Sequence, residues 1–259
     1  MQDSSYSAVF GALAQQNRLD VIANNLANVN TTGFKGDKLA FRDTFERYAH
    51  DLVDPNQTLD SKVSWPKSYV LAQSRIAERV IDFSQGNLKT TGNPLDLAIS
   101  GEGFFKVQTA DGEFLTRQGC YHRSSEGFIV DGHGNKLLGE GGPIQLPENA
   151  GTLTIDEQGT LSVDGEILDQ IALVTVADPK VLEKVGNSLL RINPDSKAQP
   201  LPAENATIEQ GFLEAANVEV VTEMVNMIEA TRAFEAYQKM ITGTFDQDKK
   251  AIAEVGAPK

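Results

Sequence analysis

The chain has little of what an enzyme or a membrane protein usually carries. Its 259 residues include one cysteine, one tryptophan and three histidines, so no disulfide can form within the chain. It lacks an apolar run of about 18 residues, which predicts no transmembrane helix and no direct membrane insertion. Residues 1–6 have neither a basic region nor an apolar stretch, so we expect no cleaved signal peptide.

Basic side chains are also fewer than acidic ones: 23 Lys and Arg stand against 36 Asp and Glu, which gives a formal net charge of -13. Residues 1–50 carry five basic and five acidic side chains, and residues 212–259 carry five basic and eight acidic ones, so most of the excess lies in the middle. This acidity argues against nucleic acid as a partner, since such binding needs a basic patch. Near-neutral ends can meet like neighbours, while the acidic middle favours solubility.

Both ends of the chain carry helical patterns. Near the start, apolar residues follow 3-4-3 spacing at Leu19, Ile22, Leu26 and Val29. This helix should end at residues 30–33, where a glycine allows a left-handed stop. The second helix should run from about Asn217 to Ala253, and its first half bears a second apolar row at Val218, Val221, Val225 and Ile228. So broad a face exceeds what one shorter partner helix can cover, which predicts contact with another chain.

Between the helices the pattern changes to short strands and turns. Apolar runs occur at residues 97–99, 104–107, 128–130, 137–138, 153–155, 161–163 and 171–176. Three Asp-Gly pairs stand between such runs, at Asp111-Gly112, Asp131-Gly132 and Asp164-Gly165, and this pair is a strong hairpin signal. The sequence predicts an antiparallel β domain. Residues 36–75 are weakly patterned, and residues 50–75 are a candidate linker.

No motif for catalysis or ligand binding is evident. Cys120 and His122 share one face of an expected strand, but two residues without a third ligand do not predict a metal site. The glycine-rich stretches at residues 101–104 and 139–142 do not lead into a helix, so neither is expected to bind phosphate. We therefore expect no catalytic residue, no cofactor and no metal.

Asparagines are the unusual polar residues of the first helix. Asn24, Asn25 and Asn28 lie inside an otherwise good helical pattern, where asparagine is unfavourable. They mark either a fraying last turn or amides that hydrogen-bond neighbouring helices and fix their register. On the second interpretation, Asn217 and Asn226 are the natural counterparts at the other end.

These segments resemble one known family. The chain is similar to bacterial flagellar axial proteins, the rod and hook subunits, in its N-terminal signature at residues 23–35. The similarity continues, in the same order, through residues 85–88, 91–99, 103–105, 116–119, 216–219, 223–228 and 232–235. Within the family, the Gly-Gly-Pro-Ile element at residues 141–144 resembles the proximal-rod branch, and the distal rod is the alternative. Residues 216–219 read Ala-Asn-Val-Glu where the family often has Ser-Asn-Val-Asn.

The resemblance implies a non-catalytic structural subunit of the flagellar basal-body rod. Its fold would be α+β, with the N- and C-terminal helices forming a coiled-coil-like layer beside a central antiparallel all-β domain. Its partners would be copies of itself, other rod proteins and the flagellar type III export apparatus, and its place would be the rod that crosses the periplasm. Contacts between such subunits must be head-to-tail, so that a helical assembly grows. A competing hypothesis from another class is a secreted β-domain enzyme with helical oligomerisation ends.

The expected organisation has four parts: an axial helix at residues 1–35, an extension and linker at 36–75, a β domain at 76–211 and a second axial helix at 212–259. The expected assembly interface comprises Leu19, Ile22, Asn24, Asn25, Leu26, Asn28, Val29, Asn30, Gly33, Phe34, Asn217, Val218, Val221, Met224, Val225, Asn226, Met227, Ile228, Arg232, Phe234, Ile241 and Phe245.

Overall fold

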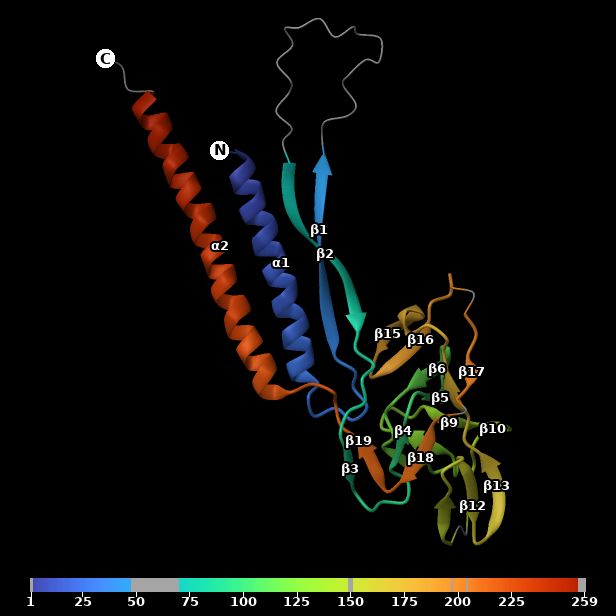
Figure 1. Ribbon diagram of the computed structural model, residues 1–259. Helices are drawn as coiled ribbons and strands as arrows, with labels where there is room; N and C mark the ends of the chain where they lie inside the picture. Colours follow the sequence, from blue (N-terminus) through green and yellow to red (C-terminus); the bar gives the residue numbers. More distant parts are fainter. Residues whose placement is uncertain (1, 48–69, 149–150, 197, 204, 256–259) are drawn as a thin grey trace, which may run out of the picture. The chain divides into compact units, whose positions relative to one another are not determined.

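The computed structural model describes residues 2–47, 70–148, 151–196, 198–203 and 205–255 (Figure 1). The chain divides into two compact units. The helical unit comprises Met1–Asn24, Lys38–Val80 and Val221–Lys259, and the β unit comprises Asn25–Asp37 and Ile81–Val220. Each terminal segment therefore contributes to both units.

Two helices and one hairpin make up the helical unit. The helices are α1 (Gln2–Ala27) and α2 (Val220–Val255), as predicted for the two ends of the chain. They lie side by side, since the Tyr237 ring rests against Gly11 and the Arg18 guanidinium is 4.0 Å from the Glu229 carboxylate. These pairings run in opposite directions along the two helices, which are therefore antiparallel. None of the described helices has the length and apolar character needed to span a membrane.

Helix α1 ends three residues before the predicted stop. After Ala27 the chain makes tight turns, with the amide of Thr31 donating to the Asn28 carbonyl at 3.0 Å. The left-handed residue is Gly33 (φ +66°), as the sequence suggested. Asparagine side chains favour turns over helix, which explains the early end.

A long hairpin follows α1, and the sequence analysis did not anticipate it. Strands β1 (Asp37–Arg47) and β2 (Val70–Ile81) form a two-stranded sheet. The expected linker at residues 50–75 lies mostly outside the described residues, and its last six belong to β2. No Asp-Gly or Asn-Gly pair stands between the two strands, so the sequence lacks the two-residue hairpin signal there.

The β unit is built on one large antiparallel sheet, ordered β15-β16-β6-β5-β9-β8-β7, with β10, β14 and β17 attached. Its strands are β5 (Phe104–Thr109), β6 (Gly112–Thr116), β7 (Tyr121–Arg123), β8 (Ile129–Asp131), β9 (Lys136–Gly139), β10 (Gly142–Pro143), β14 (Leu173–Thr175), β15 (Leu182–Gly186), β16 (Leu189–Ile192) and β17 (Leu201–Pro202). A 3-10 turn, η1 (Pro179–Val181), precedes β15.

Smaller sheets complete this unit. They are β11-β12-β13, β18-β4 and β19-β3. Their strands are β3 (Leu88–Thr90), β4 (Leu97–Ser100), β11 (Leu153–Ile155), β12 (Thr160–Val163), β13 (Glu166–Gln170), β18 (Thr207–Gln210) and β19 (Phe212–Glu214). Residues 212–214, which were grouped with the second helix, thus form a strand paired with β3.

The predicted Asp-Gly turns do join paired strands. Asp164 and Gly165 connect β12 to β13, with Val163 opposite Glu166. Both turn residues have positive φ, 53° and 88°, the conformation of a two-residue hairpin loop that matches strand twist. The prediction of an antiparallel β region of short strands is confirmed.

The β unit has its own apolar core. Phe105, Val107 and Leu137 are completely buried in its main cluster. A second cluster forms around Phe104 and Leu115. This core gives the turns and loops around it a fixed frame.

Candidate functional site

A buried charge cluster joins three distant parts of the β unit. The Glu214 carboxylate, from β19, is 2.6 Å from the Lys35 ammonium and 3.2 Å from the Arg117 guanidinium. Its side chain is 0% exposed, and those of Lys35 and Arg117 are 3% and 5% exposed. We call Lys35, Arg117 and Glu214 the charge cluster. Buried charges need such pairing, because desolvating them alone is costly.

Backbone groups add further hydrogen bonds to the cluster, although Nε of Arg117 is buried without a hydrogen-bond partner among the described residues. Lys35 donates to the Ser84 carbonyl at 2.8 Å. Arg117 donates to the carbonyls of Ile99 (3.3 Å) and Gly101 (2.6 Å). The amide of Gly86 donates to the Glu214 carboxylate at 2.9 Å. The cluster therefore fixes loops as well as charges.

Burial sets the electrostatics of the two cations. Desolvation lowers the pKa of Lys35 below 10.5, although the Glu214 carboxylate opposes this shift. Desolvation likewise lowers the pKa of Arg117, again against the pull of Glu214. Glu214 thus supplies the charge that keeps two buried cations tolerable in one place.

Two glycines allow the backbones to meet at the cluster. The amide of Gly33 donates to the Glu214 carbonyl at 2.8 Å, and a Cβ at Gly33 would collide with the backbone of Arg117. A Cβ at Gly86 would collide with the Ala215 carbonyl. Only glycine fits such close approaches.

The chain passes between the two units at four places, after residues 24, 37, 80 and 220. Two asparagine side chains connect the β-unit segments that lie next to these places. Asn25 forms a reciprocal pair with the backbone of Asp37, both bonds being 2.9 Å. Asn217 accepts from the Gly36 amide at 2.7 Å and donates to the Asp82 carbonyl at 2.7 Å. Residues near 25, 37, 82 and 217 are therefore held together on the β-unit side of all four crossings.

Lys184, from β15, contacts the same segment at residues 34–37. The Lys184 ammonium is 2.9 Å from the Asp37 carboxylate, whose side chain is 1% exposed. It also donates to the Lys35 carbonyl and lies 4.4 Å from the centre of the Phe34 ring. We call the charge cluster together with Asn25, Asp37, Lys184 and Asn217 the junction.

The expected interface residues fall into three groups in the structure. Those buried within this chain are Ile22, Asn25, Gly33 and Phe34. Those that are half-buried are Leu19, Leu26, Asn28, Val29, Asn217, Val218, Asn226, Met227, Phe234 and Ile241. The exposed ones are Asn24, Asn30, Val221, Met224, Val225, Ile228, Arg232 and Phe245. Asn25 and Asn217, for which bonds to neighbouring helices were one of two interpretations, have partners within this chain.

One face of α2 presents apolar side chains to solvent. Val221, Met224, Val225 and Ile228 are 69%, 49%, 50% and 54% exposed. Ala230, by contrast, is 0% exposed. Positions 228 and 230 are about 200° apart around a helix, so the exposed apolar face lies nearly opposite the buried one. We call these four residues the α2 face.

Sequence reasoning singled out some residues of the junction but did not predict that they contact one another. Lys35 and Arg117 stood in quoted motifs, while Glu214 was missed. Its one signal is a lone carboxylate in a stretch of apolar and small residues at 211–216. In the described part of the chain, no three His, Cys, Asp or Glu residues are placed to hold a metal ion.

The amino-acid sequence is similar to flagellar rod and hook proteins. Family models match at residues 6–35 (flagella basal body rod protein), 98–163 (flagellar hook protein FlgE/F/G D1 domain) and 209–253 (flagellar basal body rod FlgEFG protein C-terminal). The flagellar basal-body rod protein FlgF of Caulobacter vibrioides is 35% identical, with 99% of each chain covered. FlgG of Bacillus subtilis is 35% identical, covering 93% of this chain and 95% of its own. FlgF of Mesorhizobium japonicum is 31% identical over 99% of each chain.

Proposed function

We propose that this chain, which belongs to the family of flagellar basal-body rod proteins and is a structural subunit of the rod, assembles through its two terminal helices. Its relatives are rod proteins, so the alternative of a secreted enzyme is not supported. The proposal adds a mechanism: α1 and α2 form a coiled-coil-like layer with the helices of neighbouring copies and of other rod proteins. The contacts are head-to-tail and build a helical tube.

The α2 face carries this proposal. Four large apolar side chains stay exposed on one side of α2 while its other side meets α1. Burying such a row against a neighbouring helix is favourable, at about 25 cal/mol for each Å² of apolar surface. Helix α2 also has 36 residues against 26 in α1. Its extra length, about 15 Å, offers further surface to a neighbour, including Ile252, which is 73% exposed.

The junction has a different role in this proposal. It fixes, within the β unit, the segments that lead into both helices. Asn25, Gly33, Phe34 and Asn217 then act inside the subunit rather than between subunits. Leu19 and Ile22 belong to the helical unit, whereas Leu26 and Val29 belong to the β unit.

We further propose a place in the proximal rod and export through the flagellar type III apparatus. The Gly-Gly-Pro-Ile element at residues 141–144 supports the first point, as do two FlgF relatives that match over 99% of each chain. Locating the tagged protein in purified basal bodies tests the proximal position, and a distal location contradicts it.

An exposed charge on the α2 face tests the assembly mechanism. In a strain that lacks the native gene, Ile228→Asp should be produced and exported but should give no complete rods and no swimming, because the new carboxylate would be buried at the contact. Rods are counted in purified basal bodies by electron microscopy. The β unit should unfold at the wild-type urea concentration.

The matched control is Gln247→Asp, an exposed position on the same helix about 100° away from Ile228. It should support normal rods. The mechanism is wrong if Ile228→Asp swims normally, or if both variants lose rods to the same extent.

A further inference from the structure

The three-stranded sheet β11-β12-β13 has an unusual free edge. Within the described residues, strand β13 has one strand partner, β12, and on its other side the Gln170 carbonyl accepts the Glu140 amide at 2.9 Å, so the free part of this edge lies at residues 166–168. It carries Ile167, which is 75% exposed, and Leu168, which is 43% exposed. The pairing register with β12 shifts between Ile167 and Asp169, so Leu168 stands at a β-bulge and both apolar side chains lie beside an irregular stretch of the edge. An exposed apolar edge of this kind is a template for pairing with another strand.

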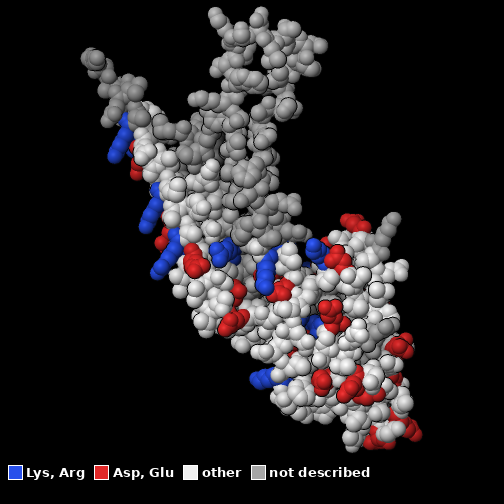
Figure 2. Space-filling view, viewed as in Figure 1, with Lys and Arg blue, Asp and Glu red and all other residues white. Residues whose placement is uncertain are grey.

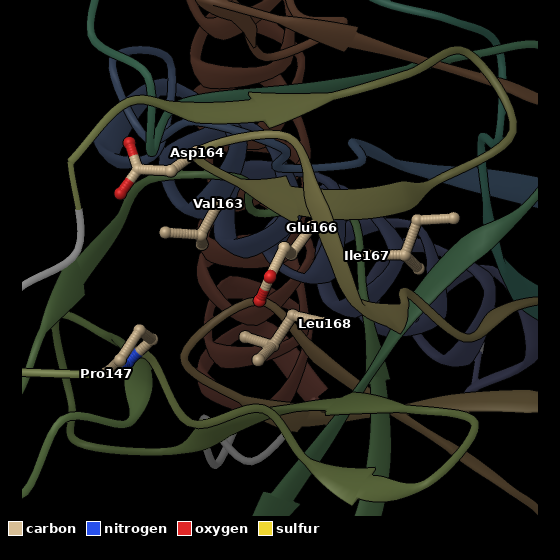
Figure 3. A pocket seen from close by; sticks show the side chains of 6 residues that line it. All are labelled: Pro147, Val163, Asp164, Glu166, Ile167 and Leu168. Atoms are coloured by element: carbon tan, nitrogen blue, oxygen red, sulfur yellow. The ribbon is translucent and has the colours of Figure 1, made fainter.

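A hollow lies beside this edge. It has a volume of ≈ 270 Å³ and is lined by Pro147, Val163, Asp164, Glu166, Ile167 and Leu168. Figure 3 shows Leu168 and Val163 near one another, with Glu166 between them and Pro147 across from them. The hollow is smaller than the pockets of about 300–1,000 Å³ that hold drug-sized ligands. It suits one side chain of a docked segment rather than a small molecule.

The charge around the edge is of one sign. Residues 153–170 contain five carboxylates and no Lys, Arg or His, and no Lys or Arg occurs between Lys136 and Lys180. On the face shown in Figure 2, carboxylates gather where Figure 1 places β12 and β13. Near this region the Arg123 guanidinium donates to the backbone carbonyl of Glu148 at 3.3 Å.

We propose that β13 is a docking strand for another protein, which adds an extended segment of alternating apolar and basic residues. Main-chain pairing along the free edge would give affinity, and the hollow would take one apolar side chain of the segment. The carboxylates of Asp164 and Glu166 select basic residues and disfavour an acidic segment. A second copy of this chain is the poorer occupant, because its own net charge is -13.

Peptides of equal length test the chemistry on the full-length protein. One alternates Val and Lys, one Val and Glu, and one Ser and Lys. The Val/Lys peptide should shift the NMR signals of residues 166–168 and bind at least about tenfold more tightly than either other peptide. Equal binding by the Ser/Lys peptide, or shifts confined to other strands, overturns the proposal.

Substitutions then place the site. Ile167→Asp should weaken Val/Lys binding by about tenfold, and Glu166→Lys should weaken it while improving Val/Glu binding. Leu201→Asp, a change at another exposed apolar position (47%) of the β unit, should leave binding unchanged. Amide exchange of Val107 and Leu137 verifies that each variant is folded.

Sedimentation of the unmodified protein decides the remaining alternative. Self-association that Ile167→Asp abolishes would mean that β13 binds a second copy, and the proposal of a basic partner would be wrong. A monomer whose Val/Lys affinity falls in Ile167→Asp but not in Leu201→Asp supports it.

Discussion

Glu214→Gln should destabilise the β unit far more than its size suggests. The change keeps the shape of the side chain but removes the charge that Lys35 and Arg117 share, at 2.6 and 3.2 Å. Breaking a buried ion pair from one side costs about 3–5 kcal/mol, because a charge stays buried without its partner. Here two cations lose it. Their bonds to the carbonyls of Ser84, Ile99 and Gly101 remain, so we expect a loss within that range rather than above it.

Urea unfolding measures the loss, followed through the NMR signals of Val107 and Leu137, which are completely buried. The control is Glu113→Gln, which removes a carboxylate 2.7 Å from Lys106 in a pair that is 59% and 29% exposed. Exposed pairs contribute about 0–1 kcal/mol. Adding Lys35→Met to Glu214→Gln should recover part of the loss, since it removes one of the two uncompensated cations.

The pH dependence gives a second measurement. Desolvation already lowers the pKa of Lys35 in the folded protein, and Glu214 opposes that shift, so the pKa falls further in Glu214→Gln. A lysine whose folded pKa lies below its unfolded value regains stability as the pH rises from the folded pKa toward 10.5. The deficit of Glu214→Gln should therefore shrink with rising pH. The reasoning is refuted if Glu214→Gln costs no more than Glu113→Gln, or if its deficit grows as the pH rises.

Three further predictions concern single residues of the β unit. Tyr121→Phe should match or exceed wild-type stability at neutral pH by up to about 1 kcal/mol, since the hydroxyl is buried without a hydrogen-bond partner. Burial also raises the pKa of Tyr121 well above 10, so wild-type stability should fall above pH 10 and the variant should lose less in an alkaline unfolding series. Asn217→Ala should cost about 1–3 kcal/mol in urea unfolding, because the Gly36 amide loses its acceptor; no loss would mean that water replaces the side chain. Gly33→Ala should destabilise the β unit by at least about 1 kcal/mol, given φ +66° and the collision with Arg117, and a neutral result would contradict the close approach.

The parts of the fold that the sequence predicted are those whose signals are local. Asp164 and Gly165 specify a tight turn by themselves, because both tolerate positive φ, and the flanking apolar runs then pair. The two terminal helices likewise follow from periodicity over many residues. Strands β1 and β2 escaped notice because they lack such a turn. Strands β3 and β19 escaped notice because they pair across more than a hundred residues of chain. Pairing at that separation has no signature in a short window.

The junction was beyond sequence reasoning for the same physical reason. Glu214 lies 179 positions from Lys35 and 97 from Arg117, so nothing in the pattern joins them. The motifs that carried the family resemblance were assigned to contacts between subunits. Asn25, Gly33 and Asn217 instead bond within the β unit. Residues typical of a family can therefore mark the inside of a subunit as readily as its interface.

This division explains how one short N-terminal signature can serve two purposes. Residues up to Asn24 belong to the helical unit, and the residues from Asn25 to Asp37 belong to the β unit, where Glu214 and Lys184 hold them. A substitution in the second part changes the folding free energy of the subunit before it changes any contact with a neighbour. A substitution on the α2 face leaves the core and the junction untouched, since Val221 and Ile228 are more than half exposed. On the proposed mechanism, stability and assembly are encoded in adjacent segments, and measuring unfolding and rod formation on the same variants separates them.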